Sequence, residues 1–222
     1  MTWPRRKQPR RPVADESSGV TAVRLRRVNR WLLEGLRQDL ADLYVASCET
    51  DPGEEYRSPS REDFLNRLTD DVRRPGFAMV IAETDGLVGC VFGLPVPGDG
   101  FWWLGFDGEL PCSIEQLTRS DRVFAITNIL VRPYPQVQGQ DLARLLQERL
   151  LTDHQASLGT TLVEQADLPA LQSFRSWGWQ DIGEIWRPNG HTMFRVLVLP
   201  LGERTVATLE GLARHAWTRW PG

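Results

Sequence analysis

A run of small and amide-bearing residues, Gln136–Ala143, comes directly before a regular apolar repeat at Leu142, Leu146 and Leu150. The repeat predicts a helix, and the N-terminus of a helix has unpaired backbone amides and a partial positive charge. Such a terminus can bind phosphate groups, and a glycine in the preceding turn lets them approach the backbone. The run therefore fits either a site for a pyrophosphate or a plain polar loop before a core helix. The carboxylate of Asp141 would repel a pyrophosphate unless it turns away to cap its own helix.

An aromatic run, Phe101–Phe106 (FWWLGF), lies in a long connection between predicted strands. Long connections are often functional, so Trp102 and Trp103 could form an aromatic wall for an apolar or ring-containing ligand. The same residues could equally be a local apolar cluster that stabilises the connection. Both interpretations stay open on the sequence alone.

Composition excludes several classes of protein. Three widely spaced cysteines and three histidines without metal-ligand spacing predict neither a disulfide framework nor a structural metal. The formal net charge of -3 gives no reason to expect nucleic acid or an anionic membrane as partner. No stretch is long and apolar enough for a transmembrane helix, so we expect a cytoplasmic protein. We expect residues 1–19 to be a disordered basic tail.

Hydrophobic periodicity and turn residues predict the elements that must position these residues, including a hairpin turn at Asp85-Gly86 and a helix cap at Ser60. The predicted strands are Val20–Leu25, Phe77–Glu83, Leu87–Leu94, Phe124–Val131, Thr160–Glu164, Asp181–Trp186 and Thr192–Leu199. The predicted helices are Asn29–Ser47, one from Ser60 to about Val72, Asp141–His154, one capped by Asp167 and ending near Gly178, and Glu203–Trp217. The segment Pro95–Asp121 is predicted to be irregular. This order indicates an α/β (α+β) domain over residues 20–200, with a C-terminal helix in residues 201–222 that packs on it.

Three local sequences, together with this element order, resemble the GNAT acetyltransferase superfamily. They are NILVRP (Asn128–Pro133), QGQDLARLLQERLL (Gln138–Leu151) and DLPALQSFRSWGWQDIG (Asp167–Gly183). The resemblance covers roughly residues 21–199. It implies a mixed, largely antiparallel sheet of about seven strands flanked by helices, in which two strands ending near Val131 and Glu164 separate from each other.

The resemblance also implies a site for an acyl-CoA, with acetyl-CoA the expected donor. The backbone of Ile129, Leu130 and Val131 would pair with the pantetheine arm as an added strand would. Two registers fit the family's Q/R-x-x-G-x-G/A loop: Gln138 to Ala143, or Gln136 to Asp141, and we prefer the first because it keeps the helix face intact. The expected cofactor residues are Ile129, Leu130, Val131, Gln136, Gln138, Gly139, Gln140, Asp141, Leu142, Ala143, Asp167 and Phe174.

The catalytic side chains of many family members are replaced in this sequence. Asn128 occupies the position of a glutamate that deprotonates the amine through water, and Phe174 occupies that of a tyrosine that protonates the thiolate. Asparagine cannot act as a base, and phenylalanine has no proton to donate. Glu164, near the end of a strand, is the candidate base, and Tyr134, just after another strand, is the candidate acid. Each of them also has a plain structural interpretation.

The resemblance implies an acyl-CoA-dependent N-acyltransferase that acts on the primary amine of a small molecule. In that case Trp102 and Trp103 would border the acceptor. A non-catalytic acyl-CoA-binding regulatory module, which Asn128 and Phe174 favour, and a protein or peptide N-acetyltransferase are the alternatives. We expect a monomer or a homodimer, with no nucleic acid, membrane or metal as partner.

Overall fold

The computed structural model describes residues 22–48, 60–133, 139–187 and 192–202. Within these residues, seven strands form one mixed sheet in the order β1-β2-β3-β4-β5-β7-β6, in which only the β4–β5 pair is parallel. The strands are β1 Arg24–Val28, β2 Ala78–Glu83, β3 Leu87–Pro95, β4 Val123–Val131, β5 Leu158–Glu164, β6 Gln180–Arg187 and β7 Thr192–Pro200. The helices are α1 Arg30–Cys48, α2 Arg61–Arg73, the 3-10 helix η1 Phe101–Trp103, α3 Cys112–Arg119, α4 Gly139–Asp153 and α5 Leu168–Ser176. This architecture confirms the predicted fold class.

Local sequence signals account for several element boundaries. Ser60 caps α2 because its hydroxyl accepts a hydrogen bond from the amide of Asp63 at 3.1 Å. Asn29 caps α1 in the same way, through the Leu32 amide at 2.9 Å. Between β2 and β3 the turn at Asp85-Gly86 closes with a backbone hydrogen bond from Thr84 to Gly86 at 3.0 Å. The hairpin predicted from that dipeptide is therefore confirmed.

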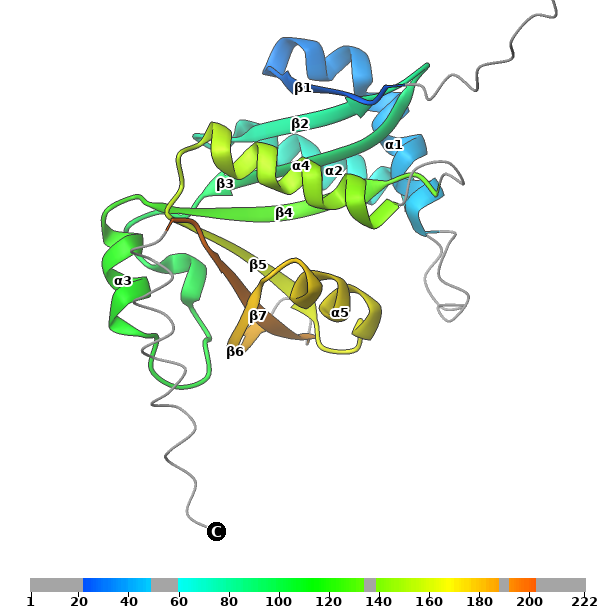
Figure 1. Ribbon diagram of the computed structural model, residues 1–222. Helices are drawn as coiled ribbons and strands as arrows, with labels where there is room; N and C mark the ends of the chain where they lie inside the picture. The colour runs from blue at the N-terminus through cyan, green and yellow to red at the C-terminus, as the bar shows by residue number, and fades with distance from the viewer. Residues whose placement is uncertain (1–21, 49–59, 134–138, 188–191, 203–222) are drawn as a thin grey trace, which may run out of the picture.

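Helices cover both faces of the sheet (Figure 1). Phe124 and Ile126 of β4 point to the face that carries α4 and α5, while Val123 and Ala125 point to the opposite face. A buried polar contact joins the two helices of the first face, since the Trp179 indole, just after α5, donates to Gln147 of α4 at 3.0 Å. On the opposite face, α1 and α2 cover strands β1–β4, and η1 and α3 cover strands β4–β7.

The structure corrects two sequence predictions. The first strand is Arg24–Val28 rather than Val20–Leu25, because its pairing with β2 continues as far as Val28 opposite Met79. The segment 95–121 is not wholly irregular, since η1 and α3 both form within it. The predicted basic tail and C-terminal helix lie outside the described residues. Among the helices described, none has both the length and the apolar character needed to cross a membrane.

Candidate functional site

The parallel strands β4 and β5 pair over only three residues and then separate. The paired positions are Val123 with Leu158, Phe124 with Gly159 and Ala125 with Thr160. Beyond Ala125, no described residue of β5 pairs with β4, and β5 continues its pairing with β7 alone. Figure 1 shows the two strands diverging after their common start. We call this separation, bounded by residues 126–131 and 161–164, the β4–β5 opening.

A bulge in β4 lies where the two strands begin to separate. Phe92 of β3 pairs with Asn128, and Gly93 pairs with Ile126, so Thr127 is an extra residue in β4. Such a bulge bends its strand and increases its local twist, which turns the rest of β4 away from β5. The Thr161 hydroxyl donates to the Ile126 carbonyl at 3.0 Å, so a side chain links the two strands just past their last backbone pair.

The bulge requires a glycine on the neighbouring strand. A Cβ atom at Gly93 would lie 2.0 Å from the Ala125 carbonyl oxygen and 2.9 Å from a ring carbon of Phe124. The backbones of β3 and β4 therefore approach more closely here than any larger residue permits. Neither the bulge nor the need for this glycine was predicted from the sequence. Both depend on how β3 pairs with β4, which the sequence of one strand alone does not reveal.

Residues after the bulge alternate between the two faces of the sheet. Ile129 and Val131 pack against the cluster under α4, and Leu130, 6% exposed, packs under α1 and α2. Asn128 is half-buried and lies opposite Phe92, whose ring is in the cluster of α1 and α2. Residues paired across antiparallel strands share a face, so Asn128 faces the side of α1 and α2. Within the described residues, the edge of β4 toward β5 is thus a row of backbone groups without a strand partner.

Helix α4 begins at Gly139, directly after the segment that follows β4. Leu142 and Ala143 are buried, and Leu142 packs with Leu146 and Leu150 in the core cluster. This confirms the apolar face of the predicted helix, which was the reason for preferring the register Gln138 to Ala143. Asp141 is exposed in the first turn, where a helix has free amides and a partial positive charge.

Several predicted site residues lie outside the described residues. They are Tyr134, Gln136 and Gln138. Gly139 and Gln140 are described only as the first residues of α4. The two loop registers therefore stay predictions, as does the role of Tyr134.

The remaining predicted residues of β5 and α5 have identifiable contacts. The carboxylate of Asp167 accepts a hydrogen bond from the Ala170 amide at 2.9 Å and so caps α5. Phe174 packs edge-on against Trp177 and Trp179, each with a ring-centroid distance of 5.3 Å, and belongs to an apolar cluster. Glu164 is exposed at the end of β5. Its strand neighbour Leu162 packs on the face of η1 and α3, and alternation places Glu164 on that face.

The aromatic loop, Phe101–Phe106, is fixed to the edge strand β6. Arg187 of β6 donates hydrogen bonds to the carbonyls of Trp102 and Leu104, and its guanidinium lies 5.9 Å from the centre of the Trp102 ring. Burial lowers the pKa of Arg187 from its usual range. The Trp103 indole is buried and donates to Thr118 of α3 at 2.9 Å. The Trp102 indole nitrogen is buried with no hydrogen-bond partner among the described residues.

Trp103 therefore has a structural role, whereas Trp102 retains an unused donor. Arg187, which the sequence analysis did not single out, holds the loop in place. Within the described parts of the chain, no three histidine, cysteine, aspartate or glutamate side chains gather as metal ligands would. The arrangement offers backbone pairing along β4 and amides at the start of α4.

Comparison with known proteins finds similarity in structure but not in sequence. No protein-family model and no curated protein matches the chain. An acetyltransferase from Thermus thermophilus gives a TM-score of 0.53 at 16% identity, over 81% of this chain and 97% of that one. The aminoglycoside acetyltransferase AAC(6')-Ib, in complex with coenzyme A and kanamycin, gives a TM-score of 0.54 at 20% identity, over 81% of this chain and 95% of that one.

A third structure is the PaiA N-acetyltransferase from Thermoplasma acidophilum, in complex with coenzyme A. It gives a TM-score of 0.52 at 9% identity, over 81% of this chain and 99% of that one. These likenesses span nearly the whole of each known structure and 81% of this chain. The protein therefore has the fold of the GNAT acetyltransferases.

Proposed function

We propose that this protein is an acyl-CoA-dependent N-acyltransferase that uses acetyl-CoA and acts on the primary amine of a small molecule. The observation that carries the proposal is the β4–β5 opening, which leaves one edge of β4 without a strand partner among the described residues and leads to the start of α4. Similar structures have been solved in complex with coenzyme A, one of them also with kanamycin. The fold alone does not define a function, so the proposal rests on this site.

The residues of the opening fit an acyl-CoA in two ways. Of the expected backbone groups, those of Ile129 and Val131 face the opening and can pair with the amide groups of an extended arm, as an added strand would, whereas Leu130 pairs with β3. The first-turn amides of α4, beginning at Gly139, can hold the pyrophosphate. The exposed carboxylate of Asp141 opposes that anion and is expected to weaken its binding. When bound, the cofactor supplies a thioester carbonyl as the acyl donor.

The side chains near the opening support positioning more than proton transfer. Acyl transfer needs a neutral amine, held in line with the thioester. Asn128 can accept a hydrogen bond from that amine or orient a water, but it cannot remove a proton. Glu164 has the chemistry of a base, and its strand alternation directs it to the face of η1 and α3. We propose Asn128 as a positioning group and Glu164 as the base, with Tyr134 as the candidate acid.

A second candidate function is a regulatory module that binds acyl-CoA without turnover. Asn128 and Phe174 favour it directly, because neither can transfer a proton. Phe174 packs against two tryptophans, so its surroundings are those of a core side chain. The two functions differ in one observable, the release of free thiol in the presence of an amine.

That difference is the test. The purified protein is incubated with acetyl-CoA and a set of small amines, and free thiol is measured over time. An enzyme gives amine-dependent thiol release, and Glu164→Gln lowers its rate and shifts or abolishes the acidic limb of its pH–rate profile, where a carboxylate base would become protonated. Binding of acetyl-CoA without amine-dependent release would establish the regulatory module, and an unaltered pH profile in Glu164→Gln would remove Glu164 as the base.

A further inference from the structure

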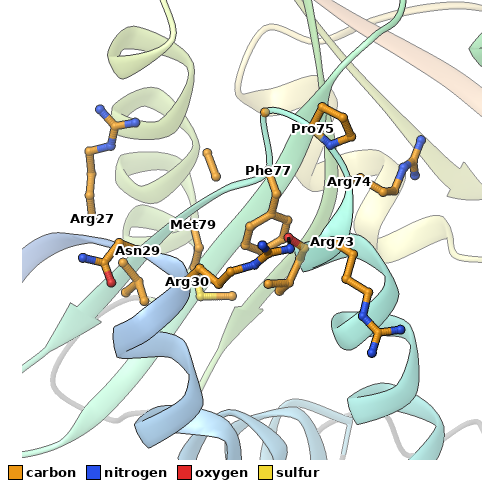
Figure 2. A pocket seen from close by; sticks show the side chains of 12 residues that line it. Arg27, Asn29, Arg30, Arg73, Arg74, Pro75, Phe77 and Met79 are labelled. Carbon is orange, nitrogen blue, oxygen red and sulfur yellow. Dashed lines mark hydrogen bonds between the residues drawn. The ribbon is translucent and has the colours of Figure 1, made fainter.

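A second site lies where the start of α1 meets the end of α2. A cavity of about 620 Å³ opens between these helix ends and the ends of β1 and β2. Figure 2 shows Arg30 lying across an apolar centre, with Arg27, Arg73 and Arg74 at the rim and their guanidinium groups directed outward. The residues that matter here are Arg27, Arg30, Arg73, Arg74, Phe77 and Met79. We call this site the arginine pocket.

The charged residues that line the arginine pocket are all positive. Its described lining contains four arginines and no aspartate or glutamate, in a chain whose formal net charge is -3. Asn29 and Arg30 form the start of α1, whose 19 residues direct a partial positive charge toward the same place. The pocket therefore gathers four arginines in a protein that is acidic as a whole, and carboxylates outside the lining partly offset the charge of three of them.

Most of the guanidinium donors are not used inside the described parts of the protein. Three arginines have a carboxylate neighbour, at distances too long for a hydrogen bond. These pairs are Arg27 Nε to Asp153 Oδ2 at 3.7 Å, Arg73 Nη1 to Asp70 Oδ1 at 3.9 Å, and Arg74 Nη1 to Asp71 Oδ1 at 3.6 Å. The fourth, Arg30, donates to the Val72 carbonyl at 3.1 Å and has no ion pair within the described residues.

The floor of the arginine pocket is apolar. Phe77 and Met79 lie in its middle, and the ring of Phe77 is fixed by packing on Phe92 at a centroid distance of 5.9 Å. Small-molecule sites of this size are commonly lined by apolar surface with a few placed polar groups. The combination fits a ligand that has both an apolar body and a negative charge.

The arginine pocket is separate from the proposed acyl-CoA site. Arg27 contacts Asp153, the last residue of α4, whereas the β4–β5 opening leads to Gly139, its first residue. A helix of 15 residues is about 22 Å long, so the two sites lie at opposite ends of α4. A ligand in one site does not occupy the other.

We infer that the arginine pocket binds an organic phosphate. Arginine pairs with phosphate through two parallel hydrogen bonds, and several arginines around one pocket suit the multiple charge of phosphate. The apolar floor at Phe77 and Met79 receives the organic part. The phosphate could belong to a free metabolite or to the headgroup of a lipid, and the experiment has one arm for each source.

The test is calorimetric titration of the full chain with ADP and with inorganic pyrophosphate, and co-sedimentation with phosphatidylglycerol vesicles. Three variants are compared with the wild type: Arg30→Gln/Arg74→Gln in the pocket, Gly139→Glu at the cofactor helix, and Arg119→Gln as a control. Arg119 is an exposed arginine of α3, paired with Glu115 and remote from the pocket in sequence. All the arginines replaced are exposed, so the variants should fold, which circular dichroism verifies.

We expect binding of at least one soluble probe, weakened about tenfold or more by the pocket variant because two charge-assisted contacts are lost. Arg119→Gln should bind as the wild type does, and Gly139→Glu should lose only binding at the cofactor helix and keep the arginine-dependent binding. Arginine-dependent binding to vesicles alone would identify the phosphate as that of a lipid. No binding of any probe at millimolar concentration, or binding that only Gly139→Glu removes, would overturn the inference.

Discussion

Replacing Gly93 by alanine should destabilise the protein strongly, because the added methyl group meets backbone. Its Cβ would lie 2.0 Å from the Ala125 carbonyl oxygen, whereas carbon and oxygen pack at about 3.3 Å or more. A carbonyl cannot rotate away as a side chain can, so β3 and β4 must separate at the bulge. Overpacking costs about 1–3 kcal/mol, and contact with backbone places this variant near the upper end, at about 3 kcal/mol.

Gly35→Ala is the matched control, since it adds the same methyl group where nothing lies within 4 Å. Gly35 is an exposed position in α1, so alanine should stabilise the helix by about 0.5–1 kcal/mol. The assay is urea denaturation followed by circular dichroism, with thermal melting beside it. For a protein of this size, a loss of about 3 kcal/mol lowers Tm by about 6–12 °C. Equal stability of Gly93→Ala and the wild type, within about 0.5 kcal/mol, would refute the close approach at the bulge.

Three further predictions concern charge. Asp141→Asn should tighten acetyl-CoA binding by about two- to fivefold, because a carboxylate leaves the first turn of α4, and the gain should shrink in high salt. The hydrogen bonds from Arg26, at 2.9 and 3.2 Å, lower the pKa of Glu83. A lowered pKa stabilises the fold above the ordinary glutamate value, so Glu83→Gln should cost stability at neutral pH, and this cost should shrink as pH falls below that value and vanish only below the lowered pKa. An equal cost at neutral pH and below the lowered pKa would contradict this. Arg187→Ala should loosen the aromatic loop, seen as faster proteolytic cleavage within 101–106, while backbone hydrogen bonds still join Gly105 to Trp186 and Asp107 to Glu184. Unchanged cleavage would show that these backbone bonds are enough to hold the loop.

Where the signal was local, the sequence was a good guide to the fold. The caps at Ser60 and Asp167 and the Asp85-Gly86 turn depend on residues within a few positions of each other, and all three formed as predicted. The predicted end of the first strand was wrong, because that end is decided by pairing with β2, a distant segment of the sequence. Helix α3 was missed because it has only eight residues, within a segment rich in turn residues.

The candidate site could be predicted only in part. The separation of two strands ending near Val131 and Glu164 was expected, and the pairing confirms it. The bulge that causes it was not expected, since a register shift depends on how Gly93 meets a strand some thirty residues away in sequence. The arginine pocket was missed for the same reason, because Arg30 and Arg74 come from segments that only the fold brings together.

The central claim is that the β4–β5 opening and the start of α4 bind an acyl-CoA. The most direct measurement is calorimetric titration of the purified full chain with acetyl-CoA and with CoA, on the wild type and on Gly139→Glu. That variant adds a negative charge at the first residue of α4, and the arginine pocket at the other end of the helix should be unaffected by it.

We expect micromolar binding of either ligand to the wild type. Gly139→Glu should weaken it at least about tenfold, because its charge repels the phosphates and its side chain keeps them from the backbone. Absence of binding at millimolar ligand would contradict the acyl-CoA site, and the proposal of acyl transfer would be rejected while the fold stands. Equal binding to both proteins would show that the ligand binds elsewhere.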